Sequence, residues 1–509
     1  MNNLVNFLKN SGISTFYQIV SIILNFVSRY FFLKYLGIEL LGINSTIVSF
    51  INTLSLAELG FQTAITFHLY KPLEEKDEDL INRIMNIFKL IYSFVGSLIF
   101  VVGLLLIPFL SIFLKGIEID EYIILCFILN LIIVSSSYFF SYQRVLLYAD
   151  KRDFICKYVD LITSIIFTVS KIFIIVYFKS FILYLIISIF QSLIANLIIN
   201  FYTKKNYKYI KKNKIDFYYM KKIFRDVKHI ISAKFSNYIY SSTDTIIISS
   251  FVGTIYVGYF VNYTTIILQL KSLLTMVFNP LLPIIGRTSS NYNSKRQMIL
   301  FNRITFVRYI LILLVVLPTF ILIDEFISIW LGKEYIISFS LVILLIIDFY
   351  ISLIYAPCYE FIQVRGMFKE EEKIMIIGAL LNIILSIIFT LSCGIIGVLI
   401  GTVITQLFFW ISRSIVLFDN FNLEKKEIKK YWIIQFKYLI SFIIMSFVLF
   451  VIKKLFFSSF NLIVRFIIIG IVTEVFAFTF LIIFYRNDEN FKYLINLIKS
   501  FLLKRKNKE

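Results

Sequence analysis

Long apolar stretches alternate with short polar segments along the whole chain. An α-helix needs about 20 mostly apolar residues to cross a bilayer, and many stretches reach that length. The expected spans are residues 11–36, 43–70, 84–113, 121–148, 154–178, 180–202, 229–252, 255–285, 304–323, 336–362, 374–393, 395–418, 433–452 and 462–485. The pattern therefore predicts an all-α polytopic membrane protein with about fourteen transmembrane helices.

The polar segments between these stretches suggest how the chain is organised. The longest and most basic of them, residues 203–228, separates six spans from the next six. Its lysines and tyrosines fit either an amphipathic segment on the membrane surface or a solvated linker, and both interpretations stay open. The predicted parts are an N-terminal lobe (1–202), a cytoplasmic linker (203–228), a C-terminal lobe (229–418), a cytoplasmic loop (419–432), two further spans (433–485) and a basic cytoplasmic tail (486–509).

Short sequence matches relate the two groups of six spans. Gly37 and Gly42 lie between the first two spans, and Gly253 and Gly258 lie between the seventh and eighth, at an offset of 216 residues in each case. The segment SIIFTVS (164–170) recurs as SIIFTLS (386–392) at a similar offset. The agreement favours an internal duplication. Duplicated halves are common in transporters, which bind substrate between the halves.

The net charge of +20 is explained by topology. With the N-terminus in the cytoplasm, most of the 51 lysines and arginines lie in or beside cytoplasmic segments. The outside segments hold only Lys34, Lys115, Lys179, Lys333, Lys453, Lys454 and Arg465. This asymmetry follows the positive-inside rule and predicts that both termini are cytoplasmic. The surplus charge is expected to attract anionic membrane lipids, and a nucleic-acid partner is excluded.

The sequence carries no sign of a metal site, a cofactor or an enzyme. The four cysteines have no CxxC spacing, and the two histidines are far apart. No P-loop, HExxH or GxSxG motif is present. The outside loops are too short to hold a catalytic site. The first apolar stretch has no small-residue cleavage site and is too long for a signal peptide, so it is expected to remain as the first span.

Polar residues recur at helical spacing inside several spans. In the seventh span, Lys234, Asn237, Ser241 and Asp244 follow steps of three and four, so they share one helix face. A Lys or Asp at the bilayer centre costs about 2.5–3.5 kcal/mol. Such a face therefore predicts a polar cavity. Comparable faces include Asn25 and Arg29 in the first span, Glu58 in the second, and Gln269 beside Lys271 in the eighth.

Each charge inside a span has a functional and a structural interpretation. Arg29 either contacts an anionic ligand or pairs with Glu58. Lys234 either binds ligand or extends to the cytoplasmic surface, whereas the deeper Lys271 is the better ligand candidate. Glu58 or Asp244 either binds a driving H⁺ or Na⁺ or neutralises a lysine. Lys171, Asp348 and Glu474 also lie within spans, and the sequence assigns them no role.

Several motifs resemble a known family. SSTDTIIISSFVGTIYVGYF (241–260), WLGKEY (330–335), the run from Arg365 to Gln406, and YLGIELLG with AELGF (57–61) are similar to segments of Wzx-type polysaccharide flippases. These belong to the multidrug/oligosaccharidyl-lipid/polysaccharide exporter superfamily. The resemblance implies two pseudo-symmetric six-helix lobes around a central cavity, with two additional C-terminal helices.

The resemblance also implies a function. The chain is expected to flip undecaprenyl-pyrophosphate-linked oligosaccharide from the cytoplasmic to the outer leaflet of the bacterial plasma membrane by alternating access. Arg29, Lys234 and Lys271 are the expected pyrophosphate contacts, and Asn25, Asn237 and Gln269 the expected sugar contacts. Other polysaccharide-assembly proteins are further candidate partners. Coupling to H⁺ or Na⁺ is left open.

Two alternatives within the superfamily remain at this stage. A lipid II flippase has the same layout and is expected to carry a denser cluster of arginines in the first lobe than the single Arg29. A drug/cation antiporter shares the twelve-helix core and is expected to have an acidic cavity rather than a basic one.

Overall fold

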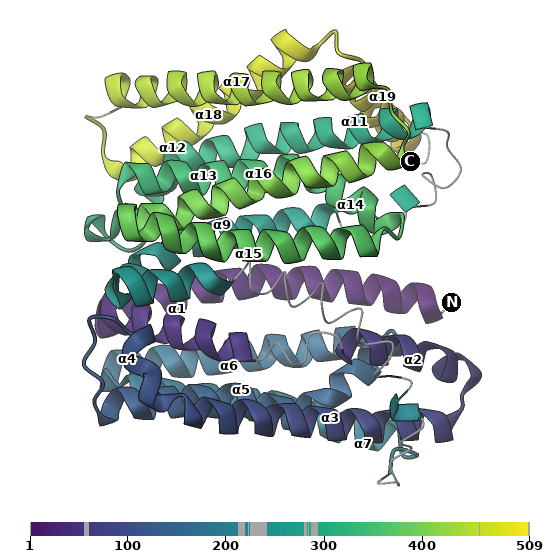
Figure 1. Cartoon of the computed structure of the whole chain (residues 1–509), viewed down its shortest axis with the longest axis vertical. Coiled ribbons are helices and arrows are strands. Elements are labelled where there is room, and N and C mark those ends of the chain that lie inside the picture. Colours follow the sequence, from purple (N-terminus) through teal and green to yellow (C-terminus); the bar gives the residue numbers. More distant parts are fainter. Residues whose placement is uncertain are drawn as a thin grey trace. The chain divides into compact units, whose positions relative to one another are not determined.

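The computed structural model of the chain describes residues 2–54, 61–211, 219–221, 223, 242–278, 282, 285–286, 294–457 and 459–506. In this part of the chain every regular element is a helix (Figure 1). Among the described residues, 12 helices are long and apolar enough to cross a membrane. The prediction of an all-α polytopic membrane protein is confirmed.

The two remaining expected spans also have counterparts. Helix α1 (Asn2–Leu54) bends at Gly37 (φ 85°, ψ 172°), so it contains the first expected span and the beginning of the second, which continues in α2 (Phe61–Glu75). The seventh expected span begins outside the described residues and ends in the short apolar helix Ser242–Val252. The helices found thus account for about fourteen spans.

One predicted boundary is wrong. Residues 84–113 are expected to form a single span, but α3 (Glu78–Leu105) stops earlier. It is followed by a 3₁₀ turn, η2 (Ile107–Phe109), and the short helix α4 (Leu110–Phe113). Pro108 lacks the N–H that a continuous helix needs and its ring clashes with the preceding turn, so the helix is interrupted there.

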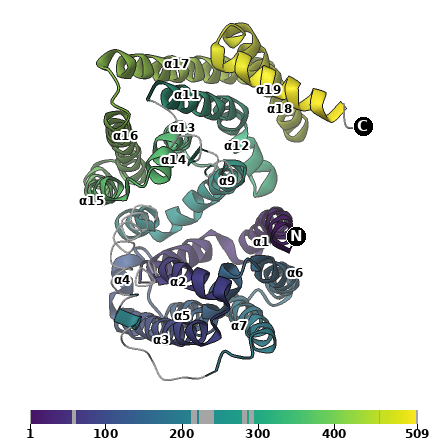
Figure 2. The ribbon, with the colours of Figure 1, turned by 90° about the vertical axis from the view of Figure 1, so that its right-hand side faces the viewer.

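The described chain forms two compact units, the first of which comprises Met1–Val261 and Ser386–Val398. Besides α1 to α4, it contains α5 (Glu121–Ala149), α6 (Asp153–Phe178), α7 (Phe181–Asn206), the π-helical turn η3 (Ile248–Val252) and the start of α9 (Thr254–Phe278). Helix α5 lies between α3 and α7, and α1 packs along α6 (Figure 2).

Side-chain caps start the helices of the first unit at the short loops. Asp77 accepts a hydrogen bond from the backbone N–H of Leu80 at the start of α3. Asp120 does the same for Ile123 at the start of α5. Such caps satisfy backbone donors that have no partner within the helix, and they define where each span begins.

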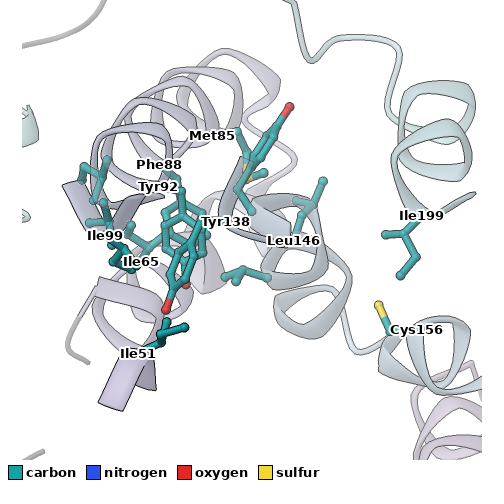
Figure 3. Packing of buried hydrophobic residues seen from close by; sticks show 14 of the residues in the cluster. Ile51, Ile65, Met85, Phe88, Tyr92, Ile99, Tyr138, Leu146, Cys156 and Ile199 are labelled. Atoms are coloured by element: carbon teal, nitrogen blue, oxygen red, sulfur yellow. The ribbon is translucent and has the colours of Figure 1, made fainter. Parts of the chain in front are cut away.

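An apolar core holds α2, α3 and α5 together. Phe88 and Tyr92 of α3 pack edge to face with ring centroids 4.1 Å apart, and Tyr92 contacts Tyr138 of α5 at 5.6 Å (Figure 3). Ile51 and Ile65 are fully buried in the same cluster. Aromatic pairs in these geometries stabilise packing beyond their area alone. The core therefore fixes α5, which also contributes to the polar cavity described below.

Two of the repeated glycines of the first unit lie at a close backbone approach. A Cβ on Gly42 would stand 2.2 Å from the carbonyl oxygen of Thr254, and one on Gly258 would stand 2.5 Å from that of Ile38. Only glycine permits backbones to come this close. Of the two sequence-related glycine pairs, one member of each, Gly42 and Gly258, thus lies at this approach, whereas a Cβ on Gly37 would meet no atom within 4 Å.

The second unit comprises Asn262–Leu385 and Leu399–Glu509. Its helices are the rest of α9, then α11 (Ser294–Leu311), η5 (Ile312–Val316), α12 (Leu317–Trp330), η6 (Lys333–Tyr335), α13 (Phe339–Ile354), α14 (Ala356–Val364), α15 (Phe368–Cys393), α16 (Ile395–Asn420), α17 (Lys425–Phe456), α18 (Leu462–Tyr485) and α19 (Glu489–Lys506). Helix α12 packs against α17 and α18. Tyr309 and Tyr438 stack with centroids 4.0 Å apart, which ties α11 to α17.

Candidate functional site

The residues predicted from the sequence lie in different environments. On α1, the Asn25 side chain is exposed, whereas the Arg29 side chain is half-buried. Asp244 lies half-buried in the helix Ser242–Val252, and Gln269 lies half-buried on α9. Glu58, Lys234 and Asn237 are outside the described residues, so their predicted roles stay predictions.

A polar cavity of about 460 Å³, open on one side, lies between α1, α5, α6 and α7 of the first unit. Its volume falls within the range of about 300–1,000 Å³ that is typical of small-molecule sites. It is lined by Tyr17, Ile133, Ser137, Ser141, Arg144, Asp160, Thr163, Ser164, Lys171, Ser188, Gln191, Ser192, Ala195 and Asn196. Polar side chains thus dominate a cavity that is built from membrane-spanning helices.

One part of the wall is a neutral ion pair. The Arg144 guanidinium of α5 donates two hydrogen bonds of 2.9 Å to the Asp160 carboxylate of α6. Its Nε donates a third, of 2.8 Å, to the amide oxygen of Asn196 on α7. Such a two-point contact is strong and fixes geometry. The pair joins three helices and leaves little net charge for a ligand.

Lys171 contributes a positive charge of a different kind. Its ammonium donates a 2.7 Å hydrogen bond to the amide oxygen of Gln191 and lies 5.3 Å from the ring centroid of Tyr184. No carboxylate among the described residues lies within ion-pair distance of it. An amide and a ring face stabilise an ammonium without neutralising it. The side chains known to line the cavity therefore carry about one net positive charge.

Hydroxyl groups supply most of the remaining polar surface. Ser137, Ser188 and Thr163 donate to backbone carbonyls one turn earlier in their own helices, at 2.7, 2.9 and 2.8 Å. Their oxygen lone pairs remain available as acceptors. The cavity thus combines a cation with many acceptors, a combination suited to a hydroxylated, negatively charged ligand.

The spacing of these residues is visible in the sequence. Ser137, Ser141 and Arg144 follow steps of four and three on α5, and Ser188, Gln191, Ser192, Ala195 and Asn196 share one face of α7. These faces were not among the predicted sites, although Lys171 was recognised as a charge within a span. Testing every predicted span for polar residues at steps of three and four finds them.

In the second unit, Lys271 is paired. Its ammonium lies 3.0 Å from the Asp348 carboxylate of α13. Asp348 also accepts a 2.8 Å hydrogen bond from Gln406 of α16, whose amide oxygen in turn accepts one of 2.7 Å from Tyr355. The contact gives Asp348 the partner that the sequence could not assign. Lys271 remains a candidate for substrate binding only as a member of a pair.

Other buried and half-buried cations of the second unit also have acidic partners. Arg413 of α16 pairs with Glu371 of α15 at 2.6 Å. Lys453 and Arg465 share the buried Glu325 of α12, at 2.6 and 3.4 Å. Arg308 likewise contacts Glu360. In the described part of the chain, no group of three or more His, Cys, Asp or Glu residues lies close enough to hold a metal ion.

Solved structures share this fold at low sequence identity. A structure described as "Lipid II flippase MurJ, inward closed conformation" matches with a TM-score of 0.69 and 19% identity, over 94% of this chain and 99% of that one. Inward-facing and outward-facing structures of a multidrug resistance MATE family transporter of the MOP superfamily match with TM-scores of 0.56 and 0.55 and 13% identity. They cover 77% and 82% of this chain and 92% and 95% of theirs.

These likenesses confirm the predicted superfamily fold. The proteins that share it are by description a flippase and transporters. No curated protein matches the chain. A family model described as "Polysaccharide biosynthesis protein" matches residues 7–289, which is more than half of the sequence. The chain therefore belongs to the polysaccharide biosynthesis protein family.

Proposed function

We propose that this chain flips polyprenyl-pyrophosphate-linked oligosaccharides from the cytoplasmic to the outer leaflet of the bacterial plasma membrane by alternating access. The observation that carries the proposal is the family match together with a fold that a lipid II flippase shares over 94% of this chain. The family links the chain to polysaccharide synthesis, and the fold is one that moves solutes or lipids across membranes.

Flipping makes and breaks no covalent bond, so polar contacts along a hydrated path are sufficient. The pyrophosphate needs cationic partners, for which we propose Arg29, Lys234 and Lys271. The saccharide needs hydrogen-bonding partners, for which we propose Asn25, Asn237 and Gln269. Whether transport is coupled to H⁺ or Na⁺ is left open, and the candidates for binding such an ion are Glu58 and Asp244. The apolar polyprenyl chain can remain in the lipid throughout.

The proposal includes an arrangement in the membrane. Residues 1–202 and 229–418 form the two lobes that exchange access, and both termini lie in the cytoplasm. The basic segments 203–228 and 486–509 then face the anionic cytoplasmic leaflet, as the positive-inside rule requires. Other polysaccharide-assembly proteins are the expected neighbours in the membrane.

Reconstitution tests the proposal directly. The purified full chain is placed in vesicles with a polyprenyl-pyrophosphate oligosaccharide that carries a fluorophore on its sugar, and a membrane-impermeant quencher then reports transbilayer movement. We expect movement well above that in protein-free vesicles. Movement only of a lipid-linked disaccharide-pentapeptide would indicate a lipid II flippase, and efflux only of cationic drugs would indicate an antiporter. Either outcome overturns the proposal.

A further inference from the structure

The polar cavity of the first unit has properties that the proposed pyrophosphate contacts do not explain. We propose that it is a binding site for a monoanionic substituent on the carried saccharide, with Lys171 as the residue that recognises the charge. This inference rests on the proposed function. The ligand chemistry is a carboxylate or a phosphodiester attached to a sugar.

The side chain of Lys171 is held by a neutral group rather than by a carboxylate. A lysine within a membrane span is costly, by about 2.5–3.5 kcal/mol at the bilayer centre. Arg144, on the same cavity wall, meets a carboxylate at 2.9 Å, whereas Lys171 is held by the neutral amide of Gln191 at 2.7 Å. An amide holds the ammonium in place without neutralising it. A ligand that brings one negative charge completes the charge balance.

The net positive charge of the cavity favours some classes of ligand over others. A pyrophosphate carries more negative charge than the ammonium of Lys171, the one cation of the described wall without a carboxylate partner, can balance. A cation such as Na⁺ is repelled by the ammonium, and Asp160 is already bound by Arg144 through both oxygens. A neutral sugar carries no negative charge that could balance the Lys171 ammonium. A monoanionic sugar fits the charge and the hydroxyl-rich walls together.

The cavity also extends far enough to hold a sugar unit beside the charge. Asp160 and Lys171 are 11 positions apart on α6, which corresponds to about 16 Å along the helix axis. Between them, Thr163 and Ser164 line the wall, and Ser188 and Ser192 face the same cavity from α7. Hydroxyl and amide groups at helical intervals are suited to a polyhydroxylated ligand, which they orient by hydrogen bonds.

Binding to the detergent-solubilised full chain is the first test. The probes are methyl glucuronoside for the carboxylate, glucosyl methyl phosphodiester for the phosphodiester, and methyl glucoside as the neutral analogue. We expect at least one anionic probe to bind more tightly than the neutral one. Lys171→Met is expected to weaken that binding about ten- to hundredfold, the range for loss of one charged contact. The stronger of the two anionic probes identifies the source of the charge.

Two further variants serve as controls for the binding test. Lys179→Met removes an exposed lysine at the end of the same helix and is expected to leave binding unchanged. Lys171→Arg keeps the positive charge and is expected to retain the preference for the anionic probe, even if Lys171→Met does not fold. Equal binding of anionic and neutral probes by the wild-type chain, or loss of the anionic preference in a folded Lys171→Arg protein, overturns the inference.

A transport assay separates this inference from the proposed function. Vesicles containing the wild-type chain are supplied with lipid-linked saccharides that are identical except for one uronate or one neutral hexose. We expect Lys171→Met to slow the acidic substrate selectively. If neither substrate moves with the wild-type chain, the proposed function fails. If both move and Lys171→Met slows them equally or not at all, only the inference about the cavity fails.

Discussion

Replacing one member of the Arg413–Glu371 pair is expected to destabilise the second unit strongly. The guanidinium Nη2 lies 2.6 Å from the carboxylate, Nε lies 3.1 and 3.2 Å from its two oxygens, and the two side chains are only 6% and 7% exposed. Removing one partner of a buried pair leaves the other charge without compensation, at a cost of about 3–5 kcal/mol. We expect this loss for Arg413→Met and for Glu371→Met.

The double substitution of the same pair gives the opposite expectation. Replacing both charges by methionine removes two desolvated ions at once and leaves apolar groups of similar length. Exchanges of this kind are commonly neutral or stabilising, by about 1–4 kcal/mol. The aromatic rings around the guanidinium, Phe409 at 4.6 Å and Tyr359 at 5.0 Å, can pack against methionine sulfur instead. The double variant is therefore expected to be more stable than either single variant.

The buried cysteines of the chain can report its unfolding. Cys126, Cys156 and Cys358 are buried and Cys393 is exposed, so a fluorogenic thiol reagent follows unfolding on heating once Cys393 is replaced by serine. Cys358 lies in the same unit, where its sulfur is 3.4 Å from the hydroxyl of Ser414, the residue that follows Arg413. The unfolding temperature of each variant is compared in this background.

An exposed pair serves as the control. Lys71 and Glu75 on α2 are 3.6 Å apart, with side chains 81% and 58% exposed. An exposed pair at this helical spacing contributes about 0.3–0.5 kcal/mol, so Glu75→Gln is expected to change the unfolding temperature very little. If the Arg413 and Glu371 single variants are as mild as this control, or if the double variant is as unstable as the worse single one, burial does not set the cost and the reasoning is wrong.

Three further predictions follow from other contacts. Gly42→Ala places a Cβ against a facing carbonyl and is expected to lower stability by about 1–3 kcal/mol, whereas Gly12→Ala, with no atom within 4 Å, is expected to be neutral or stabilising in the same thermal assay. Lys271→Met and Asp348→Asn are each expected to reduce lipid-linked oligosaccharide transport in vesicles, and the double variant is expected to recover stability but not transport; recovery of both would make the pair purely structural. Burial raises the pKa of Tyr209 to about 12. The stability that the neutral side chain contributes is therefore present below pH 10, where the unfolded side chain is also neutral, and is lost as the pH rises through 12. In an absorbance titration, Tyr209→Phe is expected to show one fewer late-ionising tyrosine than the wild-type chain.

Much of the fold was predictable because membrane spans are encoded locally. The length and hydropathy of each stretch are enough to predict a helix, since the bilayer leaves the backbone few other ways to satisfy its hydrogen bonds. The exceptions have local causes too. Pro108 ends α3 before the expected boundary, and the non-helical backbone of Gly37 divides α1 into two helical segments. Both residues were visible in the sequence, but their effect depends on backbone geometry that hydropathy does not report.

The candidate site was less predictable because it depends on contacts between distant helices. Nothing near Lys171 in the sequence distinguishes an ammonium held by the amide of Gln191 from one held by a carboxylate. In the same way, Lys271 reads as a free cation until Asp348, 77 residues later, is found beside it. The helix face of each residue follows from its spacing, but the partner on the facing helix does not. The sequence therefore identified charges inside spans more readily than it identified which of them remain uncompensated.

The difference between cations paired with a carboxylate and cations held by a neutral group affects how an anionic lipid-linked substrate would be recognised. A cation already paired with a carboxylate, as Lys271 is with Asp348, binds a phosphate only by exchanging one anion for another, so substrate affinity is set by a difference between two contacts. A cation held by an amide, as Lys171 is, gives up far less when an anion arrives. Paired cations thus favour weak, reversible contacts, which suit a substrate that must be released, whereas an uncompensated one favours selection. Under the proposed function, we therefore expect the cations of the second unit to support passage and the cavity of the first unit to determine which saccharide is chosen.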